Sequence, residues 1–347
     1  MKTHVGAKRI GIVLKQILAK AGVRKDVAGL VADGLIQTSL RGVDSHGIRL
    51  LPHYIRGVKG GRINPNPEYK FKKTSASTGL LDADHTFGHA AGIEAARRAV
   101  RLAEEAGTGH VSVYNSTHFG AAAYYALEIA AHDMIGMSFT NTDALVRSHA
   151  GKRAFLGNNP ICFAVPCEGE GPFCLDMATS VASFNRVRQY REDKMPAPPG
   201  IGADKNGVET TNPDDIHMLL PIGGYKGYGL SMMVEVLTSL LSGMPHGPYI
   251  PKMFEAHISE KRFLGHFVSA IRIDCFQDPY VFKERMKAMM DELRNEPRFD
   301  EHVPVQVAGD PEKQREKERS ASGIPLKPKE KAEIEALMKE FEIKGKL

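Results

Sequence analysis

The sequence is poor in cysteine and has no long apolar run. Its 347 residues include four cysteines, and no two of them have C-x-x-C spacing. So few thiols in so long a chain predict reduced, buried cysteines and a cytoplasmic protein. The longest apolar runs are shorter than the roughly 18 residues that a membrane-spanning helix needs, so no membrane partner is expected.

Neither sign of charge dominates the composition. The chain has 46 Lys and Arg against 41 Asp and Glu, a net charge of +5, and no long block of one sign. This balance does not indicate a nucleic-acid partner. With 42% hydrophobic residues, the chain is long enough for a large core divided between two domains. Lys15 and Lys20 interrupt the N-terminal apolar residues at helical spacing, which indicates an amphipathic helix and not a secretory signal.

Several common functional motifs are missing. No strand-like run is followed by the dinucleotide fingerprint G-x-G-x-x-G, and the Walker phosphate-binding pattern is absent. The G-x-S-x-G motif of serine hydrolases does not occur either. Despite 14 histidines, neither H-E-x-x-H nor paired cysteines suggest zinc, so no metal site is expected.

The hydrophobic pattern predicts a mixed α/β region in the middle of the chain, flanked by helices from both ends. Pro65 and Pro67, in a turn-rich segment at 60–69, cannot continue a helix and mark a first domain boundary. A loop is expected at 196–207, and the tail after Gly309 is expected to be polar until a last helix. Helices are predicted over 1–40 with a stop at Gly22, 89–107, 121–132, 229–243 and 331–343, and strands over 110–115, 136–141, 161–166, 173–178 and 266–273.

The segment 41–54, RGVDSHGIRLLPHY, has the composition of a site for a small acid. His46 can exchange protons near neutrality, Ser45 can orient a substrate oxygen, and Arg49 can grip a carboxylate with two hydrogen bonds. The alternative is a helix end in which Asp44 or Ser45 caps the helix and the histidine is merely exposed. Ser45 and His46 are poor candidates for a nucleophile and its base, because consecutive side chains in extended backbone point to opposite sides.

Polar residues follow three of the predicted strands. In open sheets, ligands collect beyond the carboxyl ends of strands, where helix N-termini present free amides. His118 stands at such an end and precedes a glycine, Gly120, by two positions. A ligand site and ordinary structural caps both remain open for these residues, which are His118, Asn141, Thr142, Asp143 and Asp176.

The glycine-rich segment GGYKGYG at 223–229 precedes a predicted helix and contains Lys226. Its glycines and lysine could hold a phosphate at the helix N-terminus. A tight start of the helix is the equal alternative.

Seven motifs in this order resemble the malate/L-lactate dehydrogenase type 2 family. They are RGVDSHG, THFGAAAYY, TNTD, LGNNP, LDMATS, DKNGVETTNP and GGYKGYGL, beginning at residue 41 and ending at residue 230. The family includes malate, sulfolactate and ureidoglycolate dehydrogenases, 2,3-diketogulonate reductase and reductases of cyclic imino acids. The resemblance covers nearly the whole chain.

The resemblance implies an α/β fold with a non-Rossmann nicotinamide-binding domain, built on a mixed sheet, and a discontinuous helical domain. The helical domain would consist of residues 1–72, 219–262 and 301–347. The nicotinamide-binding domain would consist of residues 73–218 and 263–300. An intertwined homodimer is also implied.

By the family pattern, His46 looks like the catalytic acid/base, with Ser45 beside it on the substrate and Asp176 holding the imidazole. In the ureidoglycolate branch the proton acceptor matches His118 instead. The cofactor, NAD or NADP, would lie along His118, Gly120, Asn141, Thr142, Asp143, Asn159, Asp176, Met177, Ala178 and Lys226.

The sequence also departs from the family pattern. Most members carry an arginine where this chain has Leu50, and Arg49 stands one position earlier. The usual P-x-G-G is Ser148-His149-Ala150-Gly151 here, and G-T-N-P is GNNP at 157–160. We expect hydride transfer between NAD(P) and a small 2-hydroxy or 2-oxo acid resembling malate or sulfolactate. The alternatives are a cyclic imino acid reductase, a ureidoglycolate-type dehydrogenase and a dimeric binding protein without turnover.

Overall fold

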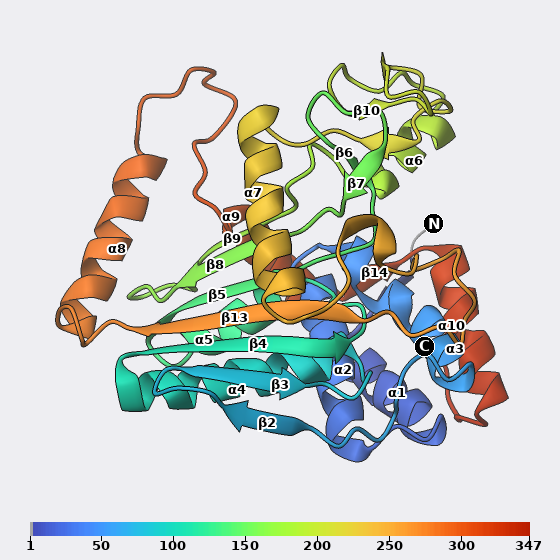
Figure 1. Ribbon diagram of the computed structural model, residues 1–347, viewed down its shortest axis with the longest axis horizontal. Coiled ribbons are helices and arrows are strands. Elements are labelled where there is room, and N and C mark those ends of the chain that lie inside the picture. Colours follow the sequence, from blue (N-terminus) through green and yellow to red (C-terminus); the bar gives the residue numbers. More distant parts are fainter. Residues whose placement is uncertain (1–2) are drawn as a thin grey trace.

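A mixed seven-stranded sheet forms the centre of the molecule (Figure 1), whose computed structural model describes residues 3–347. The strand order is β2-β3-β4-β13-β5-β8-β9. β3 and β4 run parallel, whereas the other neighbouring pairs are antiparallel. The strands are β2 (Lys70–Lys73), β3 (Thr78–Asp82), β4 (Thr108–Ser116), β13 (Leu264–Arg272), β5 (Met134–Thr140), β8 (Ile161–Val165) and β9 (Phe173–Met177).

Four strands of this sheet share one direction, and β3 is parallel to β4. β13 is antiparallel to both β4 and β5, so β4 and β5 point the same way. β8 is antiparallel to both β5 and β9, so β9 points that way too. The carboxyl ends of β4, β5 and β9 therefore meet at one edge of the sheet. The segments predicted to carry polar strand ends are adjacent for this reason.

Two alanine-rich helices cover one face of the sheet. α4 (Gly88–Ala106) packs on β4, and α5 (Ala123–Ala130) packs on β5. Small buried side chains let α4 approach closely, and a Cβ at Gly109 of β4 would collide with the carbonyl oxygen of Ala99. α4 ends at Gly107, which has the left-handed conformation (φ 81°), so the predicted helix stop is confirmed.

Helices from both ends of the chain share a second core. α1 (Ala7–Lys20), α2 (Lys25–Leu40) and α3 (Leu51–Lys59) pack with α10 (Pro328–Glu340). The break between α1 and α2 falls at Gly22, as predicted. Residues 3–5, within the helix predicted over 1–40, instead form strand β1 (Thr3–Val5), which pairs with β14 (Ile324–Leu326); residues 1–2 lie outside the described residues. This pairing brings the two ends of the chain together.

A small third core lies beyond β7 (Figure 1). The five-stranded sheet β11-β10-β12-β6-β7 packs with helix α6 (Phe184–Glu192) around Val146, Val187 and Leu219. The predicted loop at 196–207 is wrong in part, because Gly202 and Ala203 form an internal strand of this sheet. The strands are β6 (Val146–Arg147), β7 (Ala154–Leu156), β10 (Gly202–Ala203), β11 (Glu209–Thr210) and β12 (Met218–Leu219).

Other helices differ from the sequence prediction, which included neither α3 nor α6. α7 (Tyr225–Glu235) begins four residues earlier than predicted and continues as a π-helical turn (Val236–Leu240). The prediction missed α9 (Asp310–Ser322) within the polar tail, because none of its residues is buried and it has no apolar periodicity. Ion pairs attach α9 to its surroundings instead, including Lys313 with Glu170 at 2.9 Å.

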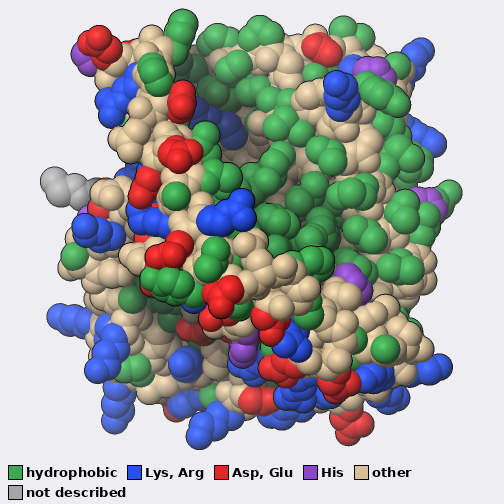
Figure 2. All heavy atoms as spheres, turned by 90° about the vertical axis from the view of Figure 1, so that its left-hand side faces the viewer, with side chains coloured by type: hydrophobic (Ala, Val, Ile, Leu, Met, Phe, Trp, Pro, Cys, Tyr) green, Lys and Arg blue, Asp and Glu red, His purple; other side chains and the backbone are tan. Residues whose placement is uncertain are grey.

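Large apolar side chains remain exposed on α7, on the π-turn and on α8 (Pro279–Arg294). Figure 2 views the side of the molecule that carries α8, and hydrophobic side chains occupy much of that face. The exposed large hydrophobic residues of these elements are Tyr225, Leu230, Met232, Met233, Val236, Leu240, Tyr280, Val281, Met289 and Leu293. Within residues 3–347, no helix is long and apolar enough to cross a membrane.

Candidate active site

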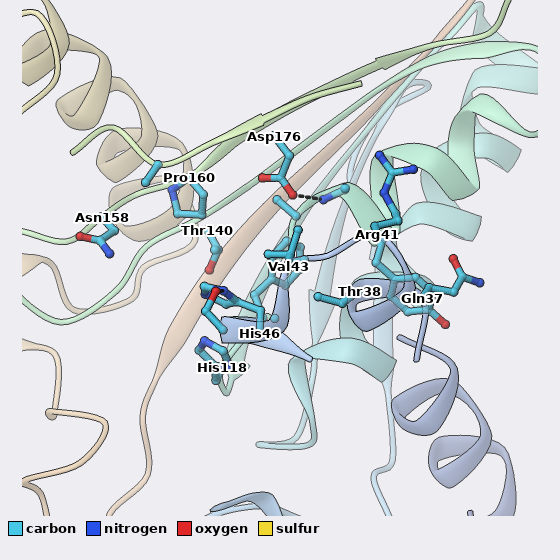
Figure 3. Close-up of a pocket in the computed structure, with 18 of the residues that line it drawn as sticks. Gln37, Thr38, Arg41, Val43, His46, His118, Thr140, Asn158, Pro160 and Asp176 are labelled. Atoms are coloured by element: carbon cyan, nitrogen blue, oxygen red, sulfur yellow. Dashed lines mark hydrogen bonds between the residues drawn. The ribbon is translucent and has the colours of Figure 1, made fainter. Parts of the chain in front are cut away.

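A pocket opens at the edge where β4, β5 and β9 end (Figure 3). It encloses about 1130 Å³ of empty space, part of which is open solvent. Its walls come from the end of α2, the turn after α2, the start of α5 and the strand ends. Of the residues singled out from the sequence, the pocket is lined by Ser45, His46, His118, Gly120, Asn141, Thr142, Asp176 and Ala178. Arg49, Asp143, Asn159, Met177 and Lys226 are not among its lining residues.

The turn that carries Ser45 and His46 is helical and not extended. Two short 3-10 turns, Asp44–His46 and Ile48–Leu50, connect α2 to α3. In this geometry Ser45 Oγ lies 2.8 Å from His46 Nδ1. The expectation that these consecutive side chains diverge is therefore wrong, because it assumed an extended backbone. Gly47 is required here, since a Cβ would collide with Ser39 Oγ.

Asp44 is engaged by the C-terminal part of the chain. Arg319 of α9 donates to both oxygens of the Asp44 carboxylate, at 2.5 and 3.0 Å. The same guanidinium donates to the Ser39 carbonyl oxygen. Arg319 thus anchors the 44–46 turn to α9, a helix that the sequence analysis did not predict.

His46 and His118 lie face to face. Their ring centroids are 5.6 Å apart with an interplanar angle of 17°. Tyr54, from α3, makes a 2.7 Å hydrogen bond with His118 Nδ1. Within residues 3–347, neither Nε2 atom has a hydrogen-bond partner. Each ring is therefore held at Nδ1 and keeps Nε2 for a ligand.

Burial keeps this histidine cluster uncharged at neutral pH. Burial, and after it the nearby charge of Arg49, lower the pKa of His46 to about 4. The pKa of His118 is well below its ordinary value, chiefly through burial and then through the other histidines and Arg262. Burial raises the pKa of the Tyr54 phenol, so Tyr54 stays protonated and can donate to a neutral His118. His118 then carries its proton on Nε2.

Asp176 contacts the start of α5 and not a histidine. Its Oδ2 accepts a 2.8 Å hydrogen bond from the Ala123 amide, dashed in Figure 3. The Asp176 side chain is open to the pocket, but the surrounding protein displaces water and raises its pKa to about 6. In the described part of the chain no hydrogen bond joins Asp176 to His46. Ser45 and Tyr54 contact the imidazoles instead, which corrects the expectation for Asp176.

The loops on the other side of the pocket divide into lining and supporting residues. Thr142 lines the pocket, and its Oγ1 accepts a 3.0 Å hydrogen bond from the amide of Asn158, which also lines it. Asn141 and Asn159 have no exposed surface, and their amides donate to Ser239 Oγ at 2.7 Å and Glu235 Oε2 at 2.6 Å. Asn159 is therefore a supporting residue, and its neighbour Asn158 reaches the pocket.

Asp143 forms a buried ion pair with Arg262, at 2.6 Å. The partner comes from the segment just before β13, more than a hundred residues away, which is why the sequence did not indicate it. Gly120 has a positive φ (78°), and a Cβ there would lie 2.5 Å from His89 Nε2. Gly120 is thus required for packing on His89, in addition to any close approach of a ligand.

The start of α7 has the properties of a phosphate-binding segment. Gly223 and Gly224 both have φ of 58°, and a Cβ at either position would meet nothing within 4 Å. Their surfaces are therefore open, and Lys226 beside them is exposed with no ion pair in the chain from residue 3 onward. Open glycines, helix amides and a lone cation fit a diphosphate group.

Sequence reasoning missed Tyr54, Arg41, Asn158 and Arg319. Tyr54 stands at the end of the same RGVDSHGIRLLPHY segment, but its hydroxyl acquires a role only when α3 brings it to His118. Arg41 lines the pocket and begins that segment. Asn158 is in the recognised LGNNP motif, where a choice between adjacent asparagines needed the backbone conformation.

We expect the protein to lose stability as the pH falls from about 6.5 towards 4. Burial lowers the pKa of His46 and His53 to about 4 and that of His89 and His266 to about 3. The unfolded chain, with ordinary histidines, binds more protons in this range, so the full stability exists above pH 6.5 and decreases below it. Each such group contributes up to about 1.4 kcal/mol per pH unit. Asp176, whose pKa is raised to about 6, opposes this trend but is a single group.

Urea unfolding at pH 7.5 and pH 5 measures this difference. His89→Leu should reduce the difference between the two pH values, because it removes one buried histidine whose pKa is lowered to about 3. The replacement breaks no hydrogen bond, since neither ring nitrogen of His89 has a partner within residues 3–347. The exposed His302 serves as the control, and His302→Leu should leave the difference as in the unmodified protein. Equal unfolding free energies at the two pH values would contradict the prediction.

Comparison with known proteins identifies the family of this chain. The family described as malate/L-lactate dehydrogenase matches residues 6–335. A malate dehydrogenase from Pyrococcus abyssi is 35% identical over 340 residues, 95% of this chain and 92% of that protein. An L-sulfolactate dehydrogenase from Methanocaldococcus jannaschii is 35% identical over 281 residues, 80% of each chain. The crystal structure of malate dehydrogenase from Entamoeba histolytica superposes with a TM-score of 0.94 at 31% identity, over 100% of both chains. This chain belongs to the malate/L-lactate dehydrogenase family.

Proposed function

We propose that this protein transfers a hydride between NAD or NADP and the α-carbon of a small 2-hydroxy acid resembling malate or sulfolactate. The observation that carries the proposal is the stack of His46 and His118, two neutral imidazoles with free Nε2 atoms beside the guanidinium of Arg49. Membership of the family makes the protein an oxidoreductase that acts on hydroxy acids, with a nicotinamide cofactor. The malate and sulfolactate dehydrogenases among its relatives support the substrate class.

We assign the proton transfer to His46. Ser45 holds His46 at Nδ1, which aims Nε2 at the substrate hydroxyl. During oxidation Nε2 takes the hydroxyl proton, and in reduction it returns the proton to the carbonyl oxygen. A bound nicotinamide would supply the hydride acceptor or donor. A positioned general acid/base typically contributes about a hundred- to ten-thousand-fold. Ser45 and the pocket walls contribute by holding the reactants in contact.

Arg49 is the proposed carboxylate clamp. It is half-buried and its charge acts on His46, and no ion pair is recorded for it anywhere from residue 3 to the C-terminus. Leu50, where most family members carry arginine, is buried in the helical core and 7% exposed. The two 3-10 turns therefore direct residue 50 inwards and leave the Arg49 guanidinium half-buried near His46.

His118 and the cofactor-side loops complete the proposed site. We propose that the cofactor lies across the start of α5 and the 140–143 and 157–160 loops, with its diphosphate near Lys226. The open glycines at the start of α7 support this placement. The residues we propose for the cofactor side are His118, Gly120, Asn141, Thr142, Asp143, Asn159, Asp176, Met177, Ala178 and Lys226. The buried Asn141 and Asn159 act by supporting their loops. Catalytic participation is proposed for His46 and His118, and substrate contact for Ser45 and Arg49.

We also propose the non-Rossmann division into a nicotinamide-binding domain (73–218 and 263–300) and a helical domain (1–72, 219–262 and 301–347). Antiparallel pairing through most of the central sheet and the core shared by both chain ends support it. The middle helical segment is attached by Arg62, which is 2% exposed. Its guanidinium donates to the carbonyl oxygens of Met253, Ala256, His257 and Glu260.

Replacing His46 with glutamine should lower turnover by about two to four orders of magnitude and leave cofactor affinity nearly unchanged. The glutamine fills similar space but cannot exchange a proton at neutral pH. Steady-state rates with oxaloacetate, pyruvate and a cyclic imino acid, followed at the reduced nicotinamide absorbance, measure the loss. His302→Gln, on an exposed loop, is the matched control. Full activity of the His46 variant would move the proton transfer to His118.

Replacing Arg49 with lysine should raise KM for the best substrate, because a point charge does not reproduce the two parallel hydrogen bonds of a guanidinium. kcat should change less if the contact is equal in the ground and transition states. Arg56→Lys, the same exchange at an exposed position on α3, is the control. An unchanged KM for every active substrate would show that Arg49 does not hold the carboxylate.

We expect a homodimer in solution. The exposed apolar residues of α7, the π-turn and α8 have no covering element within residues 3–347, and such faces are usually covered by a second subunit. Light scattering at low micromolar concentration should give about twice the 38.0 kDa chain mass. A stable and fully active monomer would refute both the dimer and the assembly role of these helices.

A further inference from the structure

Glu235, the last residue of α7, is a buried carboxylate without a cation. Its side chain is 5% exposed, and no Lys, Arg or His forms an ion pair with it within residues 3–347. Three neutral donors surround it instead. Ser239 Oγ and the Gly247 amide lie 2.9 and 2.8 Å from Oε1, and Asn159 Nδ2 lies 2.6 Å from Oε2. Both carboxylate oxygens are therefore used.

Two of these donors, Asn159 and Ser239, lead to the 140–143 loop of the pocket. Asn159 Nδ2 also donates to Ser231 O, at 3.1 Å, and Asn159 Oδ1 accepts from the Thr142 amide, at 3.3 Å. Ser239 Oγ accepts from Asn141 Nδ2 at 2.7 Å, while Asn141 Oδ1 accepts from the Gly265 amide. The Glu235 carboxylate is thus linked through Ser239 to Asn141 and through Asn159 to Thr142.

The connection extends to the third lining segment. Thr142 Oγ1 accepts from the Asn158 amide at 3.0 Å, and the Asn158 carbonyl oxygen accepts from the Thr179 amide at 2.8 Å. Thr179 directly follows the Asp176-Met177-Ala178 strand end. The loops at 140–143 and 157–160 and the end of β9 are therefore joined in one network that starts at Glu235.

We propose that Glu235 is a positioning residue for the nicotinamide cofactor, which it affects only through these loops. The inference rests on the proposed function, since it concerns the cofactor side of that same pocket. A buried carboxylate without a cation is costly to desolvate. The orientation it imposes offsets that cost, because a group that only accepts hydrogen bonds fixes the Asn159 amide with its nitrogen towards Glu235 and its oxygen towards Thr142.

The π-helical turn that follows Glu235 is part of the same hydrogen-bond network. It carries Ser239 and packs against β13, where a Cβ at Gly265 would collide with the Thr238 carbonyl oxygen. π-turns inside helices occur often at functional positions. Here the turn places the Ser239 hydroxyl between Glu235 and Asn141, so that one carboxylate reaches both loops.

Glu235→Gln tests the inference without a large change in shape. One terminal position of the glutamine is an NH2 group, which must face a donor on Asn159, Ser239 or Gly247. We expect amide hydrogen exchange in 141–143 and 157–160 to accelerate about tenfold or more in the cofactor-free protein. The dissociation constant of NADH or NADPH, followed by fluorescence, should rise about tenfold. Glu255→Gln, an exposed carboxylate paired with Lys252, is the control and should change neither quantity.

A double variant that moves the negative charge from residue 235 to residue 159 makes the test stricter. In Glu235→Gln/Asn159→Asp the amide donor and the carboxylate acceptor exchange places, so the double variant should recover part of the exchange protection and of the cofactor affinity. If Glu235→Gln does not fold, Ser239→Ala removes one link only and should accelerate exchange at 141–143. A folded Glu235→Gln protein with a lower Tm but unchanged exchange and affinity would overturn the inference, as would a double variant that recovers nothing. Failure of the unmodified protein to bind either cofactor would instead refute the proposed function, while the exchange measurement would still test the network.

Discussion

The whole site depends on the position of β13 between β4 and β5. This strand comes from a distant part of the chain and is antiparallel to both neighbours, so β4 and β5 must point in the same direction. β8 imposes the same direction on β9. Without this arrangement His118, Thr142 and Asp176 would lie at opposite edges of the sheet. The pairing also brings Arg262, just ahead of β13, to Asp143.

The other half of the site is brought to this edge by the two ends of the chain. β1 pairs with β14, and α1 to α3 share a core with α10. Arg319 then fixes Asp44, and through it the turn that carries Ser45 and His46. A contact between residues 275 positions apart therefore decides where the proposed acid/base lies. Truncation of the polar tail would remove this contact although the tail contributes no buried side chain from α9.

Sequence reasoning succeeded where local patterns determine structure and failed where distant partners do. The stops at Gly22 and Gly107 and the strands that end near His118 and Asp176 follow from local conformation and periodicity. α9 was missed because its charged surface has no apolar face, and the Ser45–His46 contact was missed because a 3-10 turn replaces the assumed extended backbone. The choice between Asn158 and Asn159 depends on the positive φ (36°) of Asn159, which turns its side chain inwards to Glu235. The roles of Arg319 and Tyr54 depend on contacts across the two halves of the molecule.

The electrostatics of the pocket connect substrate binding with proton transfer. In the free protein, burial and the charge of Arg49 both oppose protonation of His46, so the ring is a neutral base. In the proposed complex, a substrate carboxylate on Arg49 would offset this positive charge, which would raise the pKa of His46 back towards its ordinary value. The ring can then carry the proton that it takes from the hydroxyl during oxidation, or donate one during reduction. Arg49 forms no ion pair within residues 3–347, so its charge is free to act on His46 until a substrate binds. Asp44, the nearest acid in the sequence, is already paired with Arg319.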